Sequence, residues 1–342
     1  MDKKRDKTDQ LLEETSRTFA LCIPLLPDPT RHEVSIAYLL FRIADTFEDS
    51  AIWSADRRIE ALQTFEDLMD EPTSAHAEQC AREWTEAPPT DHDGYRDLLE
   101  ETPTVLQEFR AMDDEAQRIV RKHVKRTSQK MASYVRRTDT NGTLRLRTME
   151  ELRVYCYAVA GIVGEMLTDL FIRNSSSLEQ VEGYLRERAP HFGEGLQLTN
   201  ILKDTNVDVE EGRSYLDGRL ERDDVFDRAR ADLDAAAEYT IALQKAGAPR
   251  GTVAFNALPL RLAWATLDRV EEEGPGAKLT RPEVFGILDD LHTALDRENP
   301  AVDHPAADRS LDAFQEDGAS VMSGVSSSGS APVVESDEAN VA

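Results

Sequence analysis

Helical periodicity is the feature that most constrains the fold of this chain. Most of residues 8–297 carries apolar side chains at three- and four-residue spacing, and no run of short alternating segments interrupts it. With 342 residues, of which 40% are hydrophobic, the chain can bury a sizeable core. We therefore predict an all-α fold with one helical domain over residues 11–297. Residues 1–10 are predicted to be a flexible N-terminus, and residues 298–342, rich in Ser and acidic side chains, a disordered tail.

The formal net charge of -26 excludes partners that need a basic face, above all nucleic acid. We favour a high-salt cytoplasm over an ordinary acidic protein, because dissolved salt screens the self-repulsion of such a charge. The three cysteines, Cys22, Cys80 and Cys156, are too scattered for a disulfide framework or a zinc site. No signal peptide and no uncharged stretch of membrane-spanning length is evident. We expect a soluble, cytoplasmic protein, with peripheral membrane contact left open and a monomer favoured.

Residues 35–50, SIAYLLFRIADTFEDS, combine two stripes on one predicted helix. The apolar stripe contains Ile36, Leu40, Ile43 and Phe47. The polar stripe has the same spacing and contains Tyr38, Arg42, Asp45 and Asp49. Two carboxylates one helical turn apart can share a divalent cation.

A second polar stripe lies much later in the chain, on residues 194–208. It contains Gln197, Asn200, Asp204 and Asp208. Magnesium prefers oxygen ligands from one or two carboxylates together with substrate phosphates, so two such stripes facing each other would bind a magnesium diphosphate. Either stripe alone could be a solvated helix face. The Arg, Asn and Gln side chains beside the aspartates, on otherwise apolar helices, favour a binding site.

The segment YCYAVAGIVGEMLTDLF, which begins at Tyr155, is rich in small and apolar residues around Gly161 and Gly164. It could be a helix that packs closely on its neighbours. It could equally be the apolar wall of a hydrocarbon cavity, with Tyr155 as the polar group near the reacting carbon. Periodicity leaves both interpretations open.

Five segments in order resemble the squalene/phytoene synthase family over about residues 11–297: SRTF (16–19), FRIADTFED (41–49), YCYAVAGIVG (155–164), QLTNILKDTNVD (197–208) and EGRSYL (211–216). The DTFED motif and FNALPLRLAWATL (255–267) are most similar to the squalene synthase branch. The resemblance implies an isoprenoid-synthase helical bundle with a central cavity, magnesium ions and two farnesyl diphosphate molecules. These would condense head to head to presqualene diphosphate, which NADPH would reduce to squalene.

The resemblance also implies roles for individual residues. Metal binding would fall to Asp45, Glu48, Asp49, Asn200, Asp204 and Asp208. Diphosphate binding would fall to Ser16, Arg17, Arg42, Lys203 and Arg213. Gln197 and Asn200 would orient the second substrate, and Tyr155 would act with the four aspartates in catalysis. Lys203 departs from the arginine that is frequent in the family, and Val207 from a common glutamate.

Two alternatives compete with squalene synthesis. A phytoene or dehydrosqualene synthase would share the first half-reaction and need no NADPH, and an inert helical scaffold would keep only the fold. No GxGxxG motif follows a predicted strand, so a nicotinamide would need another surface. GPGAKLTRPE (274–283) is a candidate cover with Lys278 near NADPH, although it could be a plain surface loop. The C-terminal anchor helix of eukaryotic members has no counterpart here, which implies peripheral delivery of the product to a bilayer.

Overall fold

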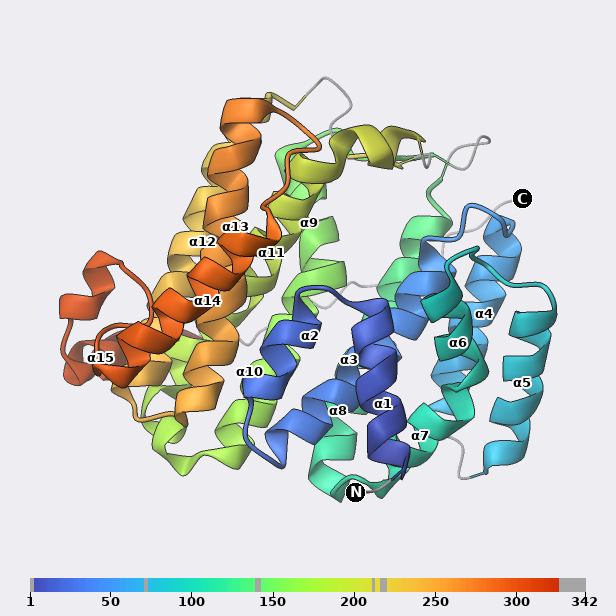
Figure 1. Cartoon of the computed structure of the whole chain (residues 1–342), viewed down its shortest axis with the longest axis horizontal. Helices are drawn as coiled ribbons and strands as arrows, with labels where there is room; N and C mark the ends of the chain where they lie inside the picture. The colour runs from blue at the N-terminus through green and yellow to red at the C-terminus, as the bar shows by residue number, and fades with distance from the viewer. Residues whose placement is uncertain (1–2, 71–72, 139–142, 211–212, 216–219, 326–342) are drawn as a thin grey trace, which may run out of the picture.

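The computed structural model describes residues 3–70, 73–138, 143–210, 213–215 and 220–325, with the side chains of 3–6, 206–210, 213–214 and 321–325 outside this description. Helices dominate the described part and confirm the all-α prediction (Figure 1). The first half contains α1 (Lys3–Thr15), α2 (Phe19–Cys22), η1 (Ile23–Leu25), α3 (Thr30–Glu48), α4 (Ala55–Leu68), α5 (Ser74–Glu86), α6 (Asp93–Glu100), α7 (Thr102–Ala111) and α8 (Asp114–Val135). The second half contains α9 (Met149–Cys156), the π-helical η2 (Tyr157–Gly161), α10 (Ile162–Asn174), η3 (Ser176–Val181), α11 (Glu182–Glu210), α12 (Arg222–Lys245), α13 (Arg250–Glu273), α14 (Arg281–Asp296), η4 (Pro305–Asp308) and α15 (Leu311–Val325).

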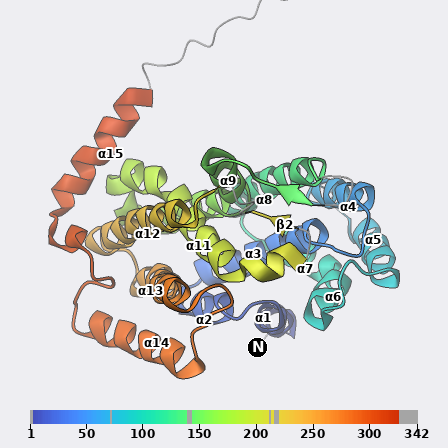
Figure 2. The same cartoon turned by 90° about the horizontal axis from the view of Figure 1, so that it is seen from above.

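The helices form two groups that meet in the middle of the molecule. In one group α3 packs on α4, α7 and α8, and in the other α11 packs on α10, α12 and α13. Contacts of α10 with α3 and with α8 join the groups. In the view from above, α12 and α13 lie on one side of the molecule and α4 to α7 on the other (Figure 2). Helices α3 and α11, which carry the two predicted polar stripes, therefore belong to different groups.

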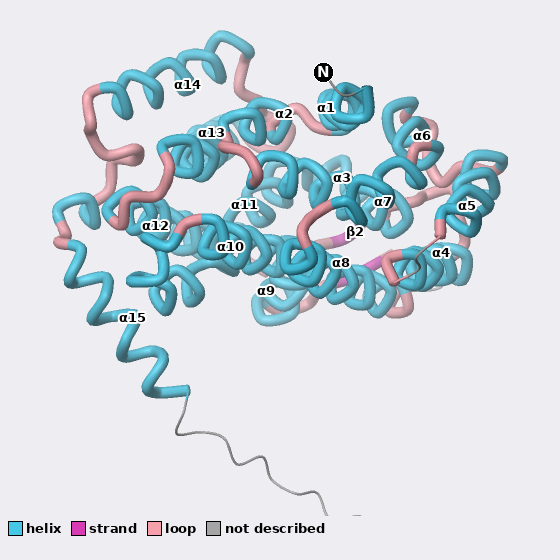
Figure 3. The backbone as a smooth tube through the Cα atoms, turned by 90° about the horizontal axis from the view of Figure 1, so that it is seen from below, coloured by secondary structure: helices cyan, strands magenta, loops and turns pink. Residues whose placement is uncertain are grey.

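Among the described residues, two short strands are the only regular secondary structure other than helix (Figure 3). Strand β1 (Leu144–Arg145) pairs in parallel with β2 (Arg213–Ser214). Leu144 lies opposite Arg213, and Arg145 opposite Ser214. This ladder brings the segment before α9 beside the segment after α11.

The apolar stripe of α3 forms part of the core, as predicted. Ile36, Leu40, Ile43 and Phe47 have no exposed surface. The Phe47 ring lies 4.6 Å from the Trp84 ring and stacks on Trp53 at 5.7 Å between centroids. Burial of each such side chain contributes about 1.5–3 kcal/mol, so this face fixes the orientation of α3 and turns its polar stripe the other way.

Glycines allow α11 to approach η2 and α10 closely. A Cβ on Gly164 would lie 2.0 Å from the carbonyl oxygen of Ala189, and one on Gly193 would lie 2.1 Å from that of Ala160. Both distances are far below van der Waals contact, and both involve backbone atoms that cannot rotate away. The predicted close helix packing at Gly164 is therefore present.

The ends of the expected domain carry more structure than the sequence indicated. Helix α1 covers most of the predicted flexible N-terminus. After α14 the chain turns back, and Arg261 Nε donates to the carbonyl of Ala301 at 2.7 Å. Phe314 of α15 is buried with its ring 4.9 Å from that of Tyr184. The structure thus differs from the predicted disordered tail over 298–325, because isolated apolar side chains in a polar segment anchor it to the core.

One helical run of the described residues, Met149–Asn174, has the length and apolarity of a membrane span. We did not predict such a run from the sequence. Half of its most apolar window is buried inside the fold. Its buried side chains include Tyr155, Cys156 and Met166, which belong to the central core.

Candidate functional site

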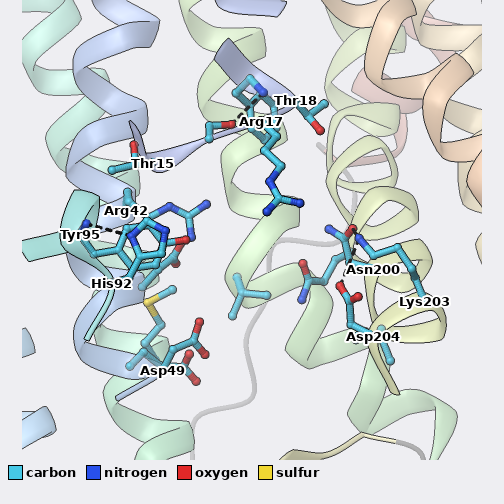
Figure 4. Close-up of a pocket in the computed structure, with 18 of the residues that line it drawn as sticks. Thr15, Arg17, Thr18, Arg42, Asp49, His92, Tyr95, Asn200, Lys203 and Asp204 are labelled. Carbon is cyan, nitrogen blue, oxygen red and sulfur yellow. Dashed lines mark hydrogen bonds and ion pairs between the residues drawn. The ribbon is translucent and has the colours of Figure 1, made fainter. Parts of the chain in front are cut away.

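A cleft of about 760 Å³ opens between α3 and α11. Its lining includes all the predicted catalytic, metal and diphosphate residues whose side chains are described: Ser16, Arg17, Arg42, Asp45, Glu48, Asp49, Tyr155, Gln197, Asn200, Lys203 and Asp204. Figure 4 shows Arg42 and Asp49 on one wall, and Asn200, Lys203 and Asp204 on the other. The two polar stripes therefore face each other across one cleft.

Contacts from three helices hold Arg42 on the α3 wall. Its Nη1 lies 3.4 Å from Asp45 Oδ2, and its Nε and Nη2 both lie 3.3 Å from the Tyr38 hydroxyl. That hydroxyl donates to the carbonyl of Thr15 in α1 at 2.9 Å. The guanidinium carbon also lies 5.5 Å from the ring centroids of Tyr38 and Tyr95, a cation–π distance. Arg42 is thus a preorganised cation at the edge of the cleft.

The carboxylates of α3 are crowded at the C-terminal end of their helix. Burial raises the pKa of Asp45 to about 6, Arg42 opposes the shift and Asp49 adds to it. Glu48 is buried, whereas Asp49, the residue that caps the helix, is exposed. Helix C-termini carry partial negative charge, which disfavours further anions. A cation bound at this point would relieve the repulsion.

The α11 wall repeats the pairing of a cation with oxygen donors. Lys203 Nζ lies 3.1 Å from Asp204 Oδ2 and donates to Asn200 Oδ1 at 3.3 Å. Leu198 and Leu202 are fully buried on the opposite face of the helix. The amphipathic pattern of α11 therefore turns its amide and carboxylate groups into the cleft.

The loop between α1 and α2 covers the cleft from a third side. Ser16 Oγ accepts from the backbone N–H of Phe19 at 2.9 Å, which fixes the start of α2. Arg17 is exposed, and Figure 4 shows its side chain extending between the two walls. This loop therefore adds a third cation, after Arg42 and Lys203, to the cleft.

Tyr155 joins the cleft from α9. It is 2% exposed, and its hydroxyl lies 2.8 Å from that of Tyr215, which is 5% exposed. The Tyr134 ring packs edge-on against Tyr155 at 5.0 Å. Burial, together with Glu48, Tyr215 and Asp49, raises the pKa of Tyr155 well above its ordinary value. Tyr155 is therefore a neutral hydroxyl group held among aromatic rings.

An apolar chamber of about 220 Å³ adjoins the cleft. The two share Phe19, Arg42, Asp45, Val159, Gln197 and Asn200. The rest of the chamber lining is apolar apart from Tyr38: Ile23, Val34, Phe41, Ala160, Val163, Gly164, Met166, Leu167, Phe192, Gly193, Leu196, Phe255 and Pro259. The glycine-rich segment therefore both packs on α11 and contributes Val159 and Val163 to the chamber. The site combines a polar mouth with a hydrocarbon-lined interior.

Three further site residues were predicted from the sequence: Asp208, Arg213 and Lys278. The side chains of Asp208 and Arg213 lie outside the described residues. Lys278 is exposed and lines neither the cleft nor the chamber. Its loop is nevertheless close to α11, because the N–H of Gly276 donates to the carbonyl of Lys203 at 2.7 Å.

The structure adds aromatic residues that we did not assign to the site from the sequence. His92 and Tyr95 of the α6 region stack at 4.2 Å between centroids and line the cleft beside Arg42. Tyr215 supplies the hydroxyl partner of Tyr155. Tyr215 lies within the EGRSYL segment, so the motif itself marked its neighbourhood, whereas His92 and Tyr95 stand in a segment without a distinguishing pattern.

A separate group of potential metal ligands, His191, Glu194 and Asp232, lies on α11 and α12. Arg228 Nε donates to Asp232 Oδ2 at 2.9 Å, and its Nη2 pairs with Asp232 Oδ1 and lies 3.2 Å from His191 Nδ1. The Arg228 guanidinium therefore already neutralises Asp232 and lies beside His191. We interpret this group as an ion-pair network that ties α12 to α11.

Comparison with known proteins places these features in a family. Residues 12–218 match the squalene/phytoene synthase family. The squalene synthases of Mycosarcoma maydis and Bos taurus are each 33% identical to this chain over 205 residues. The match covers 60% of this chain but 34% and 44% of those two proteins. The chain thus matches between a third and a half of the length of these relatives.

Solved structures share the fold at lower sequence identity. The complex of TcSQS with the ligand BPH1237 has a TM-score of 0.66 and 22% identity, and covers 94% of this chain and 99% of that one. A dehydrosqualene synthase in complex with a ligand has a TM-score of 0.55 and 17% identity, and covers 86% and 97%. The region that matches the family contains both polar stripes and the Tyr155 segment, and the chain belongs to the squalene/phytoene synthase family.

Proposed function

We propose that this protein is a prenyltransferase that condenses two farnesyl diphosphates head to head to presqualene diphosphate and then reduces this intermediate to squalene. The observation that carries the proposal is the pair of facing polar stripes on α3 and α11, whose cleft adjoins an apolar chamber. A prenyl diphosphate has the matching chemistry, with an anionic head and a hydrocarbon tail. The squalene synthases among the relatives support this choice of substrate.

The donor set fits magnesium. Carboxylate and amide oxygens are the ligands that magnesium prefers, and Asp45, Asp49, Asn200 and Asp204 supply them from both walls of the cleft. The raised pKa of Asp45 supports the fit, because a crowded carboxylate gains from a neighbouring cation. Asp208 would complete the α11 pair, and Glu48 would act through water. When bound, magnesium stabilises negative charge on the departing diphosphate.

The basic side chains that line the cleft would bind the diphosphates. Arg42 is oriented by Tyr38 and Tyr95, so its guanidinium loses little freedom when it meets a phosphate. Lys203 supplies a point charge from the opposite wall, and Arg17 with Ser16 supplies donors from the loop above. Arg213 would join them. Fixed positive groups around a leaving group lower the barrier to its departure.

Residues between the mouth and the chamber would handle the reacting carbons. Gln197 and Asn200 line both spaces and would orient the second substrate. Tyr155 would direct the carbocation and take part in the proton transfer that closes the cyclopropane ring. Its neutral hydroxyl, held among aromatic rings, is suited to that position.

Only the similarity to squalene synthases supports the reductive step. NADPH would supply the hydride, but Lys278, the residue predicted to lie near it, is exposed and away from the cleft lining. The described residues therefore do not support this contact.

Product analysis tests the proposal and separates its rivals. The purified protein is incubated with farnesyl diphosphate and magnesium at several KCl concentrations, with and without NADPH, and the lipid extract is analysed by mass spectrometry. Squalene formed only with NADPH supports the proposal. Dehydrosqualene without NADPH, or phytoene from geranylgeranyl diphosphate, would instead identify the other branch of the family. No turnover at any salt concentration would favour an inert scaffold.

A further inference from the structure

The hydroxyls of Tyr155 and Tyr215 form a buried pair that opens on the cleft. Their oxygens are 2.8 Å apart, and their rings lie 5.0 Å apart with 31° between planes. Both side chains line the cleft that also contains Asp49 and Asp204. A phenol can donate and accept at the same time, so either hydroxyl can pass a proton to the other.

The fold holds the two tyrosines together through the short ladder β1–β2. Leu144 and Arg145 pair with Arg213 and Ser214, and Tyr215 follows directly on the β2 side. On the β1 side the chain continues to Thr148, whose Oγ1 accepts from Glu151 N–H at 3.1 Å and begins α9. That helix carries Tyr155. One ladder therefore anchors both residues, although they are far apart in the sequence.

A single buried tyrosine is poorly suited to accept a proton from a substrate. Accepting it without releasing another would leave a doubly protonated oxygen, and prior ionisation would leave a phenolate on a side chain that is only 2% exposed, which burial disfavours. A second hydroxyl at hydrogen-bond distance removes this difficulty, because one proton can leave as another arrives.

We propose that Tyr215 is the relay partner of Tyr155 in the first half-reaction. This inference rests on the proposed function. Once C1 of the donor prenyl unit has bonded to C2 of the acceptor, a C–H bond at donor C1 breaks, and its electron pair closes the cyclopropane ring onto the carbocation at C3 of the acceptor. The released proton goes to Tyr155 Oη, the proton of Tyr155 goes to Tyr215 Oη, and the proton of Tyr215 goes to the released diphosphate. Charge balances, and no oxidant is needed.

The test uses Tyr215→Phe, which removes the hydroxyl and keeps the ring. Tyr134→Phe is the matched control, because Tyr134 touches the Tyr155 ring at 5.0 Å but does not line the cleft. Diphosphate release and presqualene diphosphate are measured with farnesyl diphosphate and magnesium, below the thermal midpoint of each variant. We expect Tyr215→Phe to lower kcat by about 10²-fold with little change in KM, as for loss of a proton-transfer group. Tyr134→Phe should retain the kcat of the wild type.

A double-mutant cycle separates a relay from a structural role. If Tyr215 acts through Tyr155, adding Tyr215→Phe to Tyr155→Phe should cause no further loss of kcat. Losses that multiply in the double variant, or a Tyr215→Phe enzyme as fast as the wild type, would overturn the relay. Wild type that forms no C30 diphosphate would instead refute the proposed function, and the relay with it.

Discussion

Arg42 Nη1 lies 3.4 Å from Asp45 Oδ2, one helical turn further along α3. The cation that would hold a diphosphate and the first carboxylate that would hold a metal are therefore neighbours on one rigid helix. Lys203 and Asp204 repeat the arrangement on α11 at 3.1 Å. In each wall a cation and a carboxylate therefore neutralise each other, and under the proposed function they would bind the phosphate and the metal of a magnesium diphosphate.

Replacement of a cleft carboxylate should abolish turnover without unfolding the protein. We expect Asp45→Asn to lower kcat at least about 10²-fold, as for other groups that stabilise a leaving anion. The thermal midpoint should not fall, because the substitution removes one charge from a crowded group of carboxylates. Circular dichroism and diphosphate release measure the two effects. The control is Asp289→Asn on the exposed face of α14, which should change neither.

Two outcomes for Asp45→Asn would contradict this prediction. An Asp45→Asn protein that unfolds would mark the carboxylate as structural, and one that turns over normally would remove it from the site.

Gly164 should be essential for packing. A methyl group there would meet the backbone of Ala189 at 2.0 Å, so Gly164→Ala should lower the free energy of unfolding by about 1–3 kcal/mol through overpacking. A methyl group on Gly286 in α14 would meet no atom within 4 Å, and Gly286→Ala should stabilise the helix by up to about 1 kcal/mol. Urea unfolding compares the two. Equal effects of the two substitutions would contradict the close approach of α10 and α11.

Ionised Asp169 should stabilise the folded state at neutral pH and lose this effect in acid. Burial alone would raise its pKa, but hydrogen bonds from His123, at 2.9 Å, and Arg186 lower the pKa of Asp169 from 3.8 to about 2. A carboxyl group with a depressed pKa in the folded state stabilises the fold above its unfolded pKa. This contribution is lost as the pH falls from about 4 through about 2.

The variant Asp169→Asn isolates this effect. It should be less stable than the wild type at neutral pH, and the difference should shrink as the pH is lowered through that window. Denaturant unfolding at a series of pH values measures it. A difference that does not vary with pH would show that the ion pairs of Asp169 do not act in the folded state.

Salt should stabilise this protein if it works in a high-salt cytoplasm. Screening of a net charge of -26 reduces self-repulsion, so the thermal midpoint should rise from low to molar KCl. Scanning calorimetry across KCl concentrations measures the trend. An unchanged midpoint would leave the acidic composition without that explanation.

The periodicity of the sequence predicted which site residues share one face of a helix, but not which residues face them across the cleft. The stripes of Arg42 and Asp45 and of Asn200 and Asp204 follow from the 3.6-residue period, which needs only the sequence. That the two stripes face each other depends on the packing of two helix groups. The resemblance to the family implied this, whereas spacing alone could not.

The features that were not predicted are all long-range or anchored by single residues. The contact of Tyr155 with Tyr215 depends on a two-residue ladder, too short to show as a strand pattern. Tyr95 reaches Arg42 from a helix whose pattern is otherwise ordinary. Helix α15 is held by Phe314, one aromatic ring in a segment whose composition is typical of disorder.

The most direct test of the central claim is the fate of farnesyl diphosphate with magnesium and no NADPH. We predict a C30 monodiphosphate, with one inorganic diphosphate released for every two substrates consumed. Chelation of magnesium or the substitution Asp204→Asn should abolish both. Failure to form the C30 diphosphate, or its undiminished formation by Asp204→Asn in the presence of chelator, would contradict the claim that α3 and α11 hold a magnesium diphosphate between them.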